Sequence, residues 1–230
     1  MKIFDRIMLL LFGKNLAPNT HQFGFMENCS TTMCSWVVTE TINYFTSRNT
    51  PVYSCLLDLT KAFDKVEFHT LFEKLRNKIP SIFLRLLIFS YQNQSCLVKW
   101  NNSRSRKFSI KNGVRQGAVA SPVFFSNYLD DIFTILKESG YGCWIGPYFY
   151  GIEGYADDLA LLSPDRFGLE EMLNLCKKYF DELKITISTN VDLKKTNTKC
   201  MAFGIKSELA PIALHDINLP WWEECWPHLG

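Results

Sequence analysis

The hydrophobic positions of this chain change their spacing many times, and each change predicts an element. Apolar residues three and four apart predict helices, over residues 3–12, 31–46, 66–79, 81–91, 121–138 and 163–183. Short apolar or alternating runs predict strands, over residues 52–59, 95–101, 106–111, 143–150, 185–188 and 199–203, with a strand, turn and strand over 153–162. This order of elements predicts an α+β fold, an antiparallel sheet with helices packed on one face.

A few residues mark the expected ends of these helices. Pro80 should end the helix that begins near residue 66, because proline cannot continue a helical hydrogen-bond ladder. Ser121 is the expected N-cap of the 121–138 helix, with Pro122 in its first turn. Gly140 should stop that helix.

The composition indicates a folded intracellular protein. With 230 residues, 47% of them hydrophobic, the chain can bury a large core without disulfides. Its eight cysteines include no Cys-x-x-Cys pair, so we expect reduced thiols in the cytoplasm or nucleus rather than secretion. The apolar run from Ile7 to Phe12 is too short to cross a membrane, and no membrane partner is expected.

The net charge of +2 does not identify a partner. The cations gather instead in one stretch without acids, which contains Lys99, Arg104, Arg106, Lys107, Lys111 and Arg115. Two interpretations stay open for this stretch: a solvated hairpin, or a surface that faces phosphates.

The first candidate for chemistry is the sequence LDLTKAFD, residues 57–64. Asp58 follows an apolar run, where a carboxylate costs free energy unless something pairs with it. A helix cap or an ion pair to Lys61 would explain Asp58 by itself, and for this residue alone that interpretation is favoured.

The second candidate is the sequence Tyr155-Ala156-Asp157-Asp158, at the tip of the predicted 153–162 hairpin. Adjacent carboxylates in an apolar stretch repel and raise each other's pKa, which a divalent cation would relieve. Mg²⁺ prefers oxygen ligands and is usually held by one or two carboxylates together with substrate phosphates. The alternative is a solvated Asp-Asp turn, which the apolar flanks disfavour.

The third candidate is the loop Gly113-Val114-Arg115-Gln116-Gly117 before the 121–138 helix. Two glycines, a cation, an amide and a helix N-terminus could hold a phosphate and a base, although a plain loop is the alternative. Two distant carboxylate sites with such a loop between them are what two-metal phosphoryl transfer needs.

In these three motifs the chain resembles reverse transcriptases, specifically those of non-LTR (LINE-type) retrotransposons. LDLTKAFD is similar to the family's first aspartate motif, the sequence of residues 113–132 to its second palm motif, and Tyr155–Asp158 to its signature box. The resemblance begins at His21-Gln22-Phe23-Gly24-Phe25. It implies partial fingers at residues 1–50, a palm at 51–204 with a fingers-type insertion at about 78–112, and the start of a palm–thumb junction at 205–230.

The resemblance also implies roles for matching residues. The residues that it assigns to catalysis and to two Mg²⁺ ions, for which Mn²⁺ could substitute, are Asp58, Asp157 and Asp158. The residues that it assigns to nucleotide or template binding are Phe63, Arg115, Gln116, Gly117 and Tyr155. In this scheme the ring of Phe63 would exclude a ribonucleotide 2′-OH.

The chain departs from the family's pattern in places. Met26 stands where the family usually has a basic residue. The family's Lys-Thr step, proposed to protonate pyrophosphate, matches Asn197-Thr198, so Lys195 and Lys199 are candidate proton donors instead. The fingers motif that grips the triphosphate is expected before the first residue, and the thumb after the last.

The function that follows is RNA-directed DNA polymerisation, in which a primer 3′-OH attacks a dNTP through two-metal catalysis. The expected partners are an RNA template, a DNA primer and dNTPs, and the oligomeric state is left open. A second hypothesis is a truncated, weakly active or inactive fragment that at most binds nucleic acid, for which Met26 and the missing ends argue. A third, a structural metal-binding domain, gains nothing from the order of the motifs.

Overall fold

The computed structural model describes residues 2–188, 198–205, 209–214, 217–219 and 221. The chain forms two compact units, residues 1–18 with 63–129 and residues 19–62 with 130–230. Both units are discontinuous in sequence, and the boundaries expected for fingers, palm and junction remain a prediction. None of the described helices has the length and apolarity that a membrane span needs.

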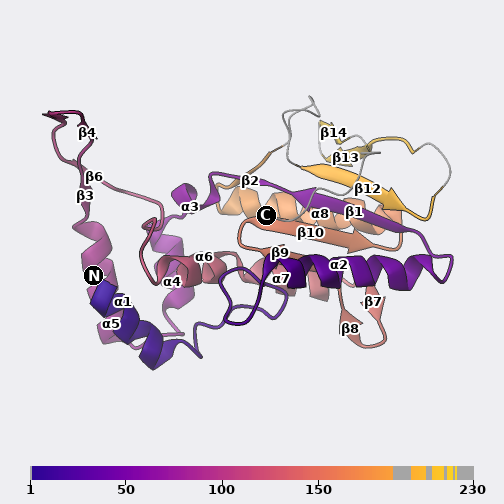
Figure 1. The fold of residues 1–230 in the computed structure, drawn as a ribbon, viewed down its shortest axis with the longest axis horizontal. Coiled ribbons are helices and arrows are strands. Elements are labelled where there is room, and N and C mark those ends of the chain that lie inside the picture. Colours follow the sequence, from indigo (N-terminus) through magenta and orange to yellow (C-terminus); the bar gives the residue numbers. More distant parts are fainter. Residues whose placement is uncertain (1, 189–197, 206–208, 215–216, 220, 222–230) are drawn as a thin grey trace. The chain divides into compact units, whose positions relative to one another are not determined.

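The second unit is built on a four-stranded antiparallel sheet in the order β12-β1-β10-β9 (Figure 1). Its strands are β1 (Val52–Leu57), β9 (Ile152–Tyr155), β10 (Asp158–Ser163) and β12 (Lys199–Phe203). In the centre, Tyr53 pairs with Ser163 and Leu57 pairs with Leu159. Apart from the partly buried Tyr53 and Asp158, all positions of β1 and β10 are buried, whichever face of the sheet they point to, which explains why both strands are mostly apolar.

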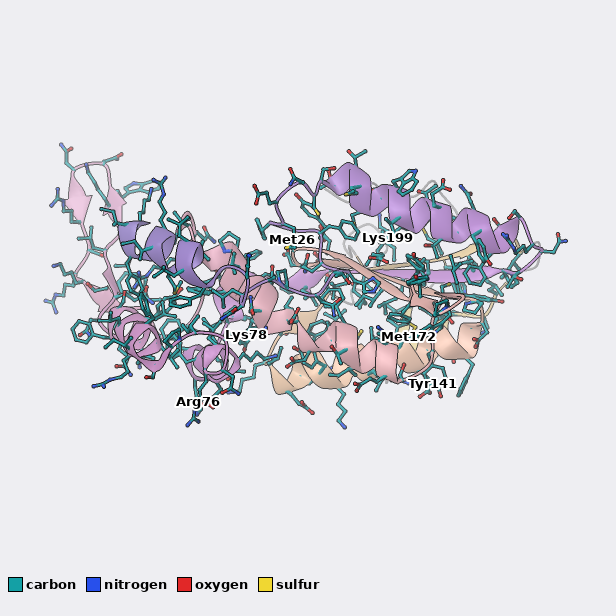
Figure 2. The ribbon with its side chains drawn as sticks, turned by 90° about the horizontal axis from the view of Figure 1, so that it is seen from below. Met26, Arg76, Lys78, Tyr141, Met172 and Lys199 are labelled. Atoms are coloured by element: carbon teal, nitrogen blue, oxygen red, sulfur yellow. The ribbon has the colours of Figure 1, made fainter. Side chains whose placement is uncertain are left out.

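Helices cover both faces of this sheet. Helix α8 (Arg166–Glu182) packs on β10 and β1, and its expected stripe is buried, with Leu169, Met172, Leu173, Cys176 and Phe180. Helix α2 (Thr31–Thr46) packs on β9 and β1 through Cys34 and Val38. Figure 2 shows α2 on one side of the sheet and α7 (Asp131–Glu138) with α8 on the other.

The α+β class and the antiparallel sheet are therefore confirmed. The expectation of helices on one face holds for α7 and α8, while α2 covers the other face. The physical reason lies in the two-residue period of β1 and β10, which places Leu56 and Ala160 toward α2 as a second apolar surface.

Three short strand pairs complete the second unit. Strand β2 (Leu59–Thr60) pairs with β11 (Thr186–Ile187), and β13 (Ile212–Leu214) pairs with β14 (Ile217–Leu219). Strand β7 (Trp144–Ile145) pairs with β8 (Tyr148–Phe149). The single strand predicted over 143–150 is therefore wrong, because the chain reverses at Gly146, whose φ of 60° suits a tight turn.

The first unit is mainly helical. It contains α1 (Lys2–Phe12), α4 (Phe68–Leu75), α5 (Ser81–Gln92) and α6 (Ser121–Leu129), with α3 (Ala62–Lys65) at its edge. Helices α4 and α6 pack together, and the unit's core contains the buried rings of Tyr91, Phe124 and Phe125. A long hairpin projects from α5, with β3 (Ser95–Cys96) paired to β6 (Phe108–Ser109) and β4 (Lys99–Trp100) to β5 (Ser103–Arg104).

Two predicted helices differ from those observed. The helix expected to run to Pro80 ends at Leu75. The chain then continues in turns, the first of which is closed by a hydrogen bond from the Arg76 N–H to the Glu73 carbonyl. The helix expected over 121–138 is interrupted at Asp130, whose carboxylate accepts the Asn19 N–H at 2.6 Å. This hydrogen bond ties the start of α7 to Asn19, 111 positions earlier in the chain. Ser121 is the first residue of α6 rather than its cap.

Candidate active site

The three aspartates singled out by sequence lie at one end of the central strand pair. Asp58 directly follows β1, Asp158 begins β10, and Asp157 lies in the turn between β9 and β10. One step beyond the Leu57–Leu159 pair, the register brings Asp58 opposite Asp158. All three side chains are partly buried. We call residues 152–163, with this turn, the carboxylate hairpin.

The electrostatics of this hairpin are those of crowded carboxylates. Burial, followed by the charges of Asp157 and Asp58, raises the pKa of Asp158 to about 6. The pKa of Asp157 is also raised, by burial and then by the charge of Asp58, against a lowering by a backbone hydrogen bond. Each negative charge therefore makes the next more costly, which is the condition that a bound cation relieves.

These residues fit a divalent cation held jointly with a substrate. Within the described ranges, no three His, Cys, Asp or Glu side chains form a ready-made metal cluster. Mg²⁺ rarely needs one, because it keeps several waters and is usually held by one or two carboxylates plus substrate phosphates. The oxygen donors and the unrelieved repulsion both suit such a hard cation.

The backbone of Asp58 is held from both sides. Its N–H donates to Thr198 Oγ1 at 3.2 Å, and its carbonyl accepts the N–H of Ser188 at 2.8 Å. Thr198 is buried. The resemblance matched it to the family step proposed to protonate pyrophosphate, and in the structure its hydroxyl supports the backbone of Asp58. Lys199, next in the chain, pairs with Leu56 in the sheet, and Lys195 lies outside the described residues.

Sequence reasoning missed the residues that support the carboxylate hairpin from residues 19–25. Gln22 is buried against the turn, and the nitrogen Nδ1 of His21 lies 3.1 Å from Oε1 of Glu153. Burial raises the pKa of Glu153, although the contact with His21 counters this. One signal could have pointed here: a glutamate inside an otherwise apolar strand, Ile152–Tyr155.

The predicted pocket residues of the other unit are held together locally. Phe63, in α3, stacks on Phe125 with ring centroids 3.9 Å apart and planes 19° apart. The N–H of Val114 donates to the Phe63 carbonyl at 3.0 Å, so the 113–117 loop is docked beside α3. Gly113 has a φ of 89°, and a Cβ there would lie 3.1 Å from the Asp64 carbonyl oxygen.

Within that loop, Arg115 is bound to other protein groups, whereas the two residues after it are exposed to solvent. The guanidinium of Arg115 donates to Gln94 Oε1 at 2.8 Å and to the carbonyl and hydroxyl of Ser90, both at 2.7 Å. Gln116 and Gly117 are exposed. Arg115 therefore anchors the loop to α5, while Gln116 and Gly117 face solvent. Tyr155, in the second unit, packs against the α2-side core.

The projecting hairpin carries four of the six cations of the basic stretch, Lys99, Arg104, Arg106 and Lys107, and we call residues 95–109 the basic hairpin. All of its residues are exposed, including Trp100 at 77% and Phe108 at 50%. Exposed cations interleaved with aromatic rings suit a nucleic-acid backbone and its bases. The exposure fits both interpretations of this stretch, a solvated hairpin and a surface that faces phosphates.

Comparison with known proteins agrees with the resemblance seen in the motifs. The family described as "Reverse transcriptase (RNA-dependent DNA polymerase)" matches residues 2–206. The Pol polyprotein of the type-1 retrotransposable element R2 of Nasonia vitripennis is 27% identical over 76% of this chain. The polyprotein of element R2DM of Drosophila melanogaster is 30% identical over 68% of it. A probable RNA-directed DNA polymerase from transposon BS of the same fly is 25% identical over 94%.

The chain spans only part of these relatives, 17%, 14% and 24% of their respective lengths. Two solved structures share its fold. Telomerase from Candida albicans, in complex with a fragment of telomeric RNA, has a TM-score of 0.59 at 12% identity, over 92% of this chain and 35% of that one. Apo telomerase from Candida tropicalis has a TM-score of 0.61 at 13% identity, over 84% and 36%. The chain belongs to the reverse transcriptase family, and its likeness to the enzymes of non-LTR (LINE-type) retrotransposons is confirmed.

Proposed function

We propose that this chain is the polymerising part of a retrotransposon reverse transcriptase, which adds dNTPs to a DNA primer on an RNA template. The observation that carries the proposal is the carboxylate group at the end of β1 and β10. There the strand register brings Asp58 opposite Asp158, next to Asp157, and burial, followed by the charges of Asp157 and Asp58, raises the pKa of Asp158 to about 6. A nucleotidyl transfer needs such a group to neutralise the triphosphate and the attacking hydroxyl.

Asp58, Asp157 and Asp158 would hold two Mg²⁺ ions, or Mn²⁺ in their place, together with the phosphates of the incoming nucleotide. When bound, these ions supply charge neutralisation for the attacking 3′-oxygen and the leaving pyrophosphate. The protein's own contribution is to fix the aspartates: the backbone of Asp58 is held by Thr198 and Ser188.

Further residues would select and complete the reaction. The ring of Phe63, fixed by its stacking on Phe125, would exclude a ribonucleotide 2′-OH. The exposed Gln116 and Gly117 would contact nucleotide or template, with Arg115 holding their loop in place. Lys199 or Lys195 would donate a proton to pyrophosphate, and Tyr155 would pack near the primer end.

Primer extension on an RNA template with Mg²⁺ tests the proposal. Asp157→Ala should reduce dNTP incorporation by about a thousandfold or more, because a metal ligand supports several kcal/mol of transition-state stabilisation. Asp181→Ala is the matched control, since Asp181 pairs with Lys177 on the exposed face of α8. Equal incorporation by the native chain and the Asp157 variant would overturn the assignment.

A second candidate function is nucleic-acid binding without polymerisation. One observation favours it: Met26 occupies a position that is usually basic in the family. In that case, neither the native chain nor the Asp157 variant would extend a primer. Both would still shift a labelled RNA–DNA duplex in a salt-sensitive manner.

A further inference from the structure

We infer that Gln22 is a positioning residue for the candidate active site: its carboxamide fixes the turn that carries Asp157. The catalytic consequence of this inference rests on the proposed function, whereas the effect on metal binding is measurable without it. Gln22 belongs to the loop before α2, far in sequence from the turn that it contacts. It lies in the same compact unit as the carboxylate hairpin.

The contact has three hydrogen bonds, two of which reach one residue of the turn. Gln22 Oε1 accepts the N–H of Ala156 at 2.9 Å, and Nε2 donates to the Ala156 carbonyl at 3.1 Å. Oε1 also accepts the N–H of Gly24 at 2.9 Å. The side chain is 1% exposed, so these bonds are shielded from water and replace the solvation that the amide gives up on burial.

The turn needs this support because Ala156 has a φ of 60°. An alanine in the left-handed region costs about 1–2 kcal/mol, and its methyl group offers no hydrogen bond in compensation. Gln22 binds both polar groups of Ala156, and the carbonyl that it holds belongs to the peptide group leading into Asp157. Fixing that peptide group fixes the direction in which the Asp157 side chain leaves the backbone.

The backbone around Gln22 is equally constrained, so the amide cannot drift. The Phe23 N–H donates to the Gly154 carbonyl at 2.7 Å, and the Gly154 N–H donates to the His21 carbonyl at 2.8 Å. At Gly24 the approach is so close that a Cβ would lie 2.2 Å from the Ala156 nitrogen. Residues 21–24 therefore lie alongside β9 through a parallel bridge between Gln22 and Gly154, and the Gln22 side chain reaches past the end of β9 to the turn.

A general structural role would make Gln22 important for stability alone. A positioning role makes a further demand: the folded protein without the amide should bind metal less well and turn over more slowly. Removing a residue that orients a metal ligand typically changes metal affinity by about 10–100-fold.

The test replaces Gln22 by methionine, which has a similar length and forms none of these hydrogen bonds. Mn²⁺ binding is followed by the electron paramagnetic resonance signal of the free ion, at temperatures where circular dichroism shows a folded chain. We expect Gln22→Met to weaken the Asp157-dependent Mn²⁺ binding about tenfold or more. In primer extension at saturating dNTP, kcat should fall by a comparable factor.

Two controls separate positioning from loss of stability. Gln92→Met makes the same chemical change at an exposed position. Leu173→Ala removes buried packing from α8 and leaves the turn's hydrogen bonds in place. We expect both to bind Mn²⁺ like the native chain, although the second should melt at a lower temperature.

If Gln22→Met does not fold, the same comparison is made with Ala156→Gly as the parent, because glycine takes a positive φ without strain. Adding Gln22→Met to that parent should again weaken Mn²⁺ binding. The inference would be overturned if the Gln22 variants kept the native Mn²⁺ affinity while Asp157→Ala lost binding. It would also be overturned if the native chain bound no Mn²⁺ in a manner that depends on Asp157. A native chain that binds Mn²⁺ and incorporates no dNTP would overturn the proposed polymerase activity alone.

Discussion

Two hairpins of this chain carry its charges, and they are built in opposite ways. The carboxylate hairpin has buried strands and a turn that hydrogen-bonds to Gln22. The basic hairpin is exposed from residue 95 to residue 109, and its strands pair in segments of two residues. One holds like charges together against their repulsion, while the other spreads cations along a solvated arm.

The difference follows from what each charge has to do. A metal-assisted transfer depends on ligand geometry at the level of a fraction of an ångström, so its carboxylates need a rigid support. Attraction to a phosphate backbone depends mainly on how many cations come near it, and tolerates a mobile support. Substitutions should therefore have sharp, position-specific effects in the first hairpin and graded, additive effects in the second.

Apart from the aspartates themselves, the largest effect is expected at Gly24, because its Cβ would overlap the Ala156 backbone. Gly24→Val should displace the turn and lower the rate of primer extension about a hundredfold, given that misplacing a reacting group by about 1 Å costs that much. Gly140→Asn is the matched control: the glycine has a φ of 79° and open space around it, and asparagine tolerates that conformation. A Gly24 variant with native rate and melting temperature would show that the carboxylate hairpin tolerates displacement of its turn.

The second prediction concerns the rigid part of the unit that carries the basic hairpin. Phe63→Ala removes the ring that stacks on Phe125, and should lower the preference for dNTPs over ribonucleotides by about tenfold or more. Single-nucleotide incorporation with each substrate measures this ratio. Phe72→Ala, which truncates another ring of the same unit, should reduce stability and leave the ratio unchanged. Equal ratios in both variants and the native chain would remove the selective role of Phe63.

The sequence predicted the local motifs of this molecule and missed its long-range contacts. The order of Asp58, the 113–117 loop and Asp157 was readable because each motif is local, and the hydrophobic period predicted α2, α5 and the two strands of the carboxylate hairpin. The contact of Gln22 with Ala156 joins residues 134 positions apart, and no local pattern encodes it. The reversal at Gly146 was hidden because the residues on either side are apolar enough to suggest one strand.

The partners of buried polar groups were unpredictable for the same reason. Thr198 matches a family motif in sequence, yet its hydroxyl accepts the N–H of Asp58 in a fold that the motif alone does not describe. Arg115 was predicted as a pocket residue, whereas three hydrogen bonds tie it to α5 and the residues that follow it. Sequence pattern therefore predicts which residue types are present near the site, and packing decides where their polar atoms point.

The third prediction concerns the basic hairpin. Replacing Arg104, Arg106 and Lys107 together by glutamine should weaken binding to single-stranded RNA by a few-fold and flatten its salt dependence. The slope of log affinity against log salt should fall by about 0.7 for each phosphate that the hairpin no longer neutralises. Fluorescence anisotropy at several salt concentrations measures both quantities.

The matched control removes three exposed cations elsewhere, Arg76, Lys137 and Lys178. Net charge changes equally in both triple variants, so a similar decrease of slope in each would mean that the binding reflects overall charge rather than the hairpin. Single replacements within the hairpin should each give about a third of the effect, in contrast with the all-or-none behaviour expected at Gly24.

The smallest effect is expected at Glu153, a buried carboxylate on strand β9 of the carboxylate hairpin. Its pKa is raised by burial, so between its ordinary and its raised pKa the folded chain binds more protons than the unfolded chain. Its contribution to stability therefore falls as pH rises through that window, and the penalty persists at neutral pH. Glu153→Gln should melt a few degrees higher than the native chain at about pH 8, with the difference vanishing near pH 4. Glu40→Gln, at an exposed position, is the control and should show no such dependence of melting temperature on pH. If the difference in melting temperature between Glu153→Gln and the native chain did not change with pH, the contact with His21 would already offset the cost of burial.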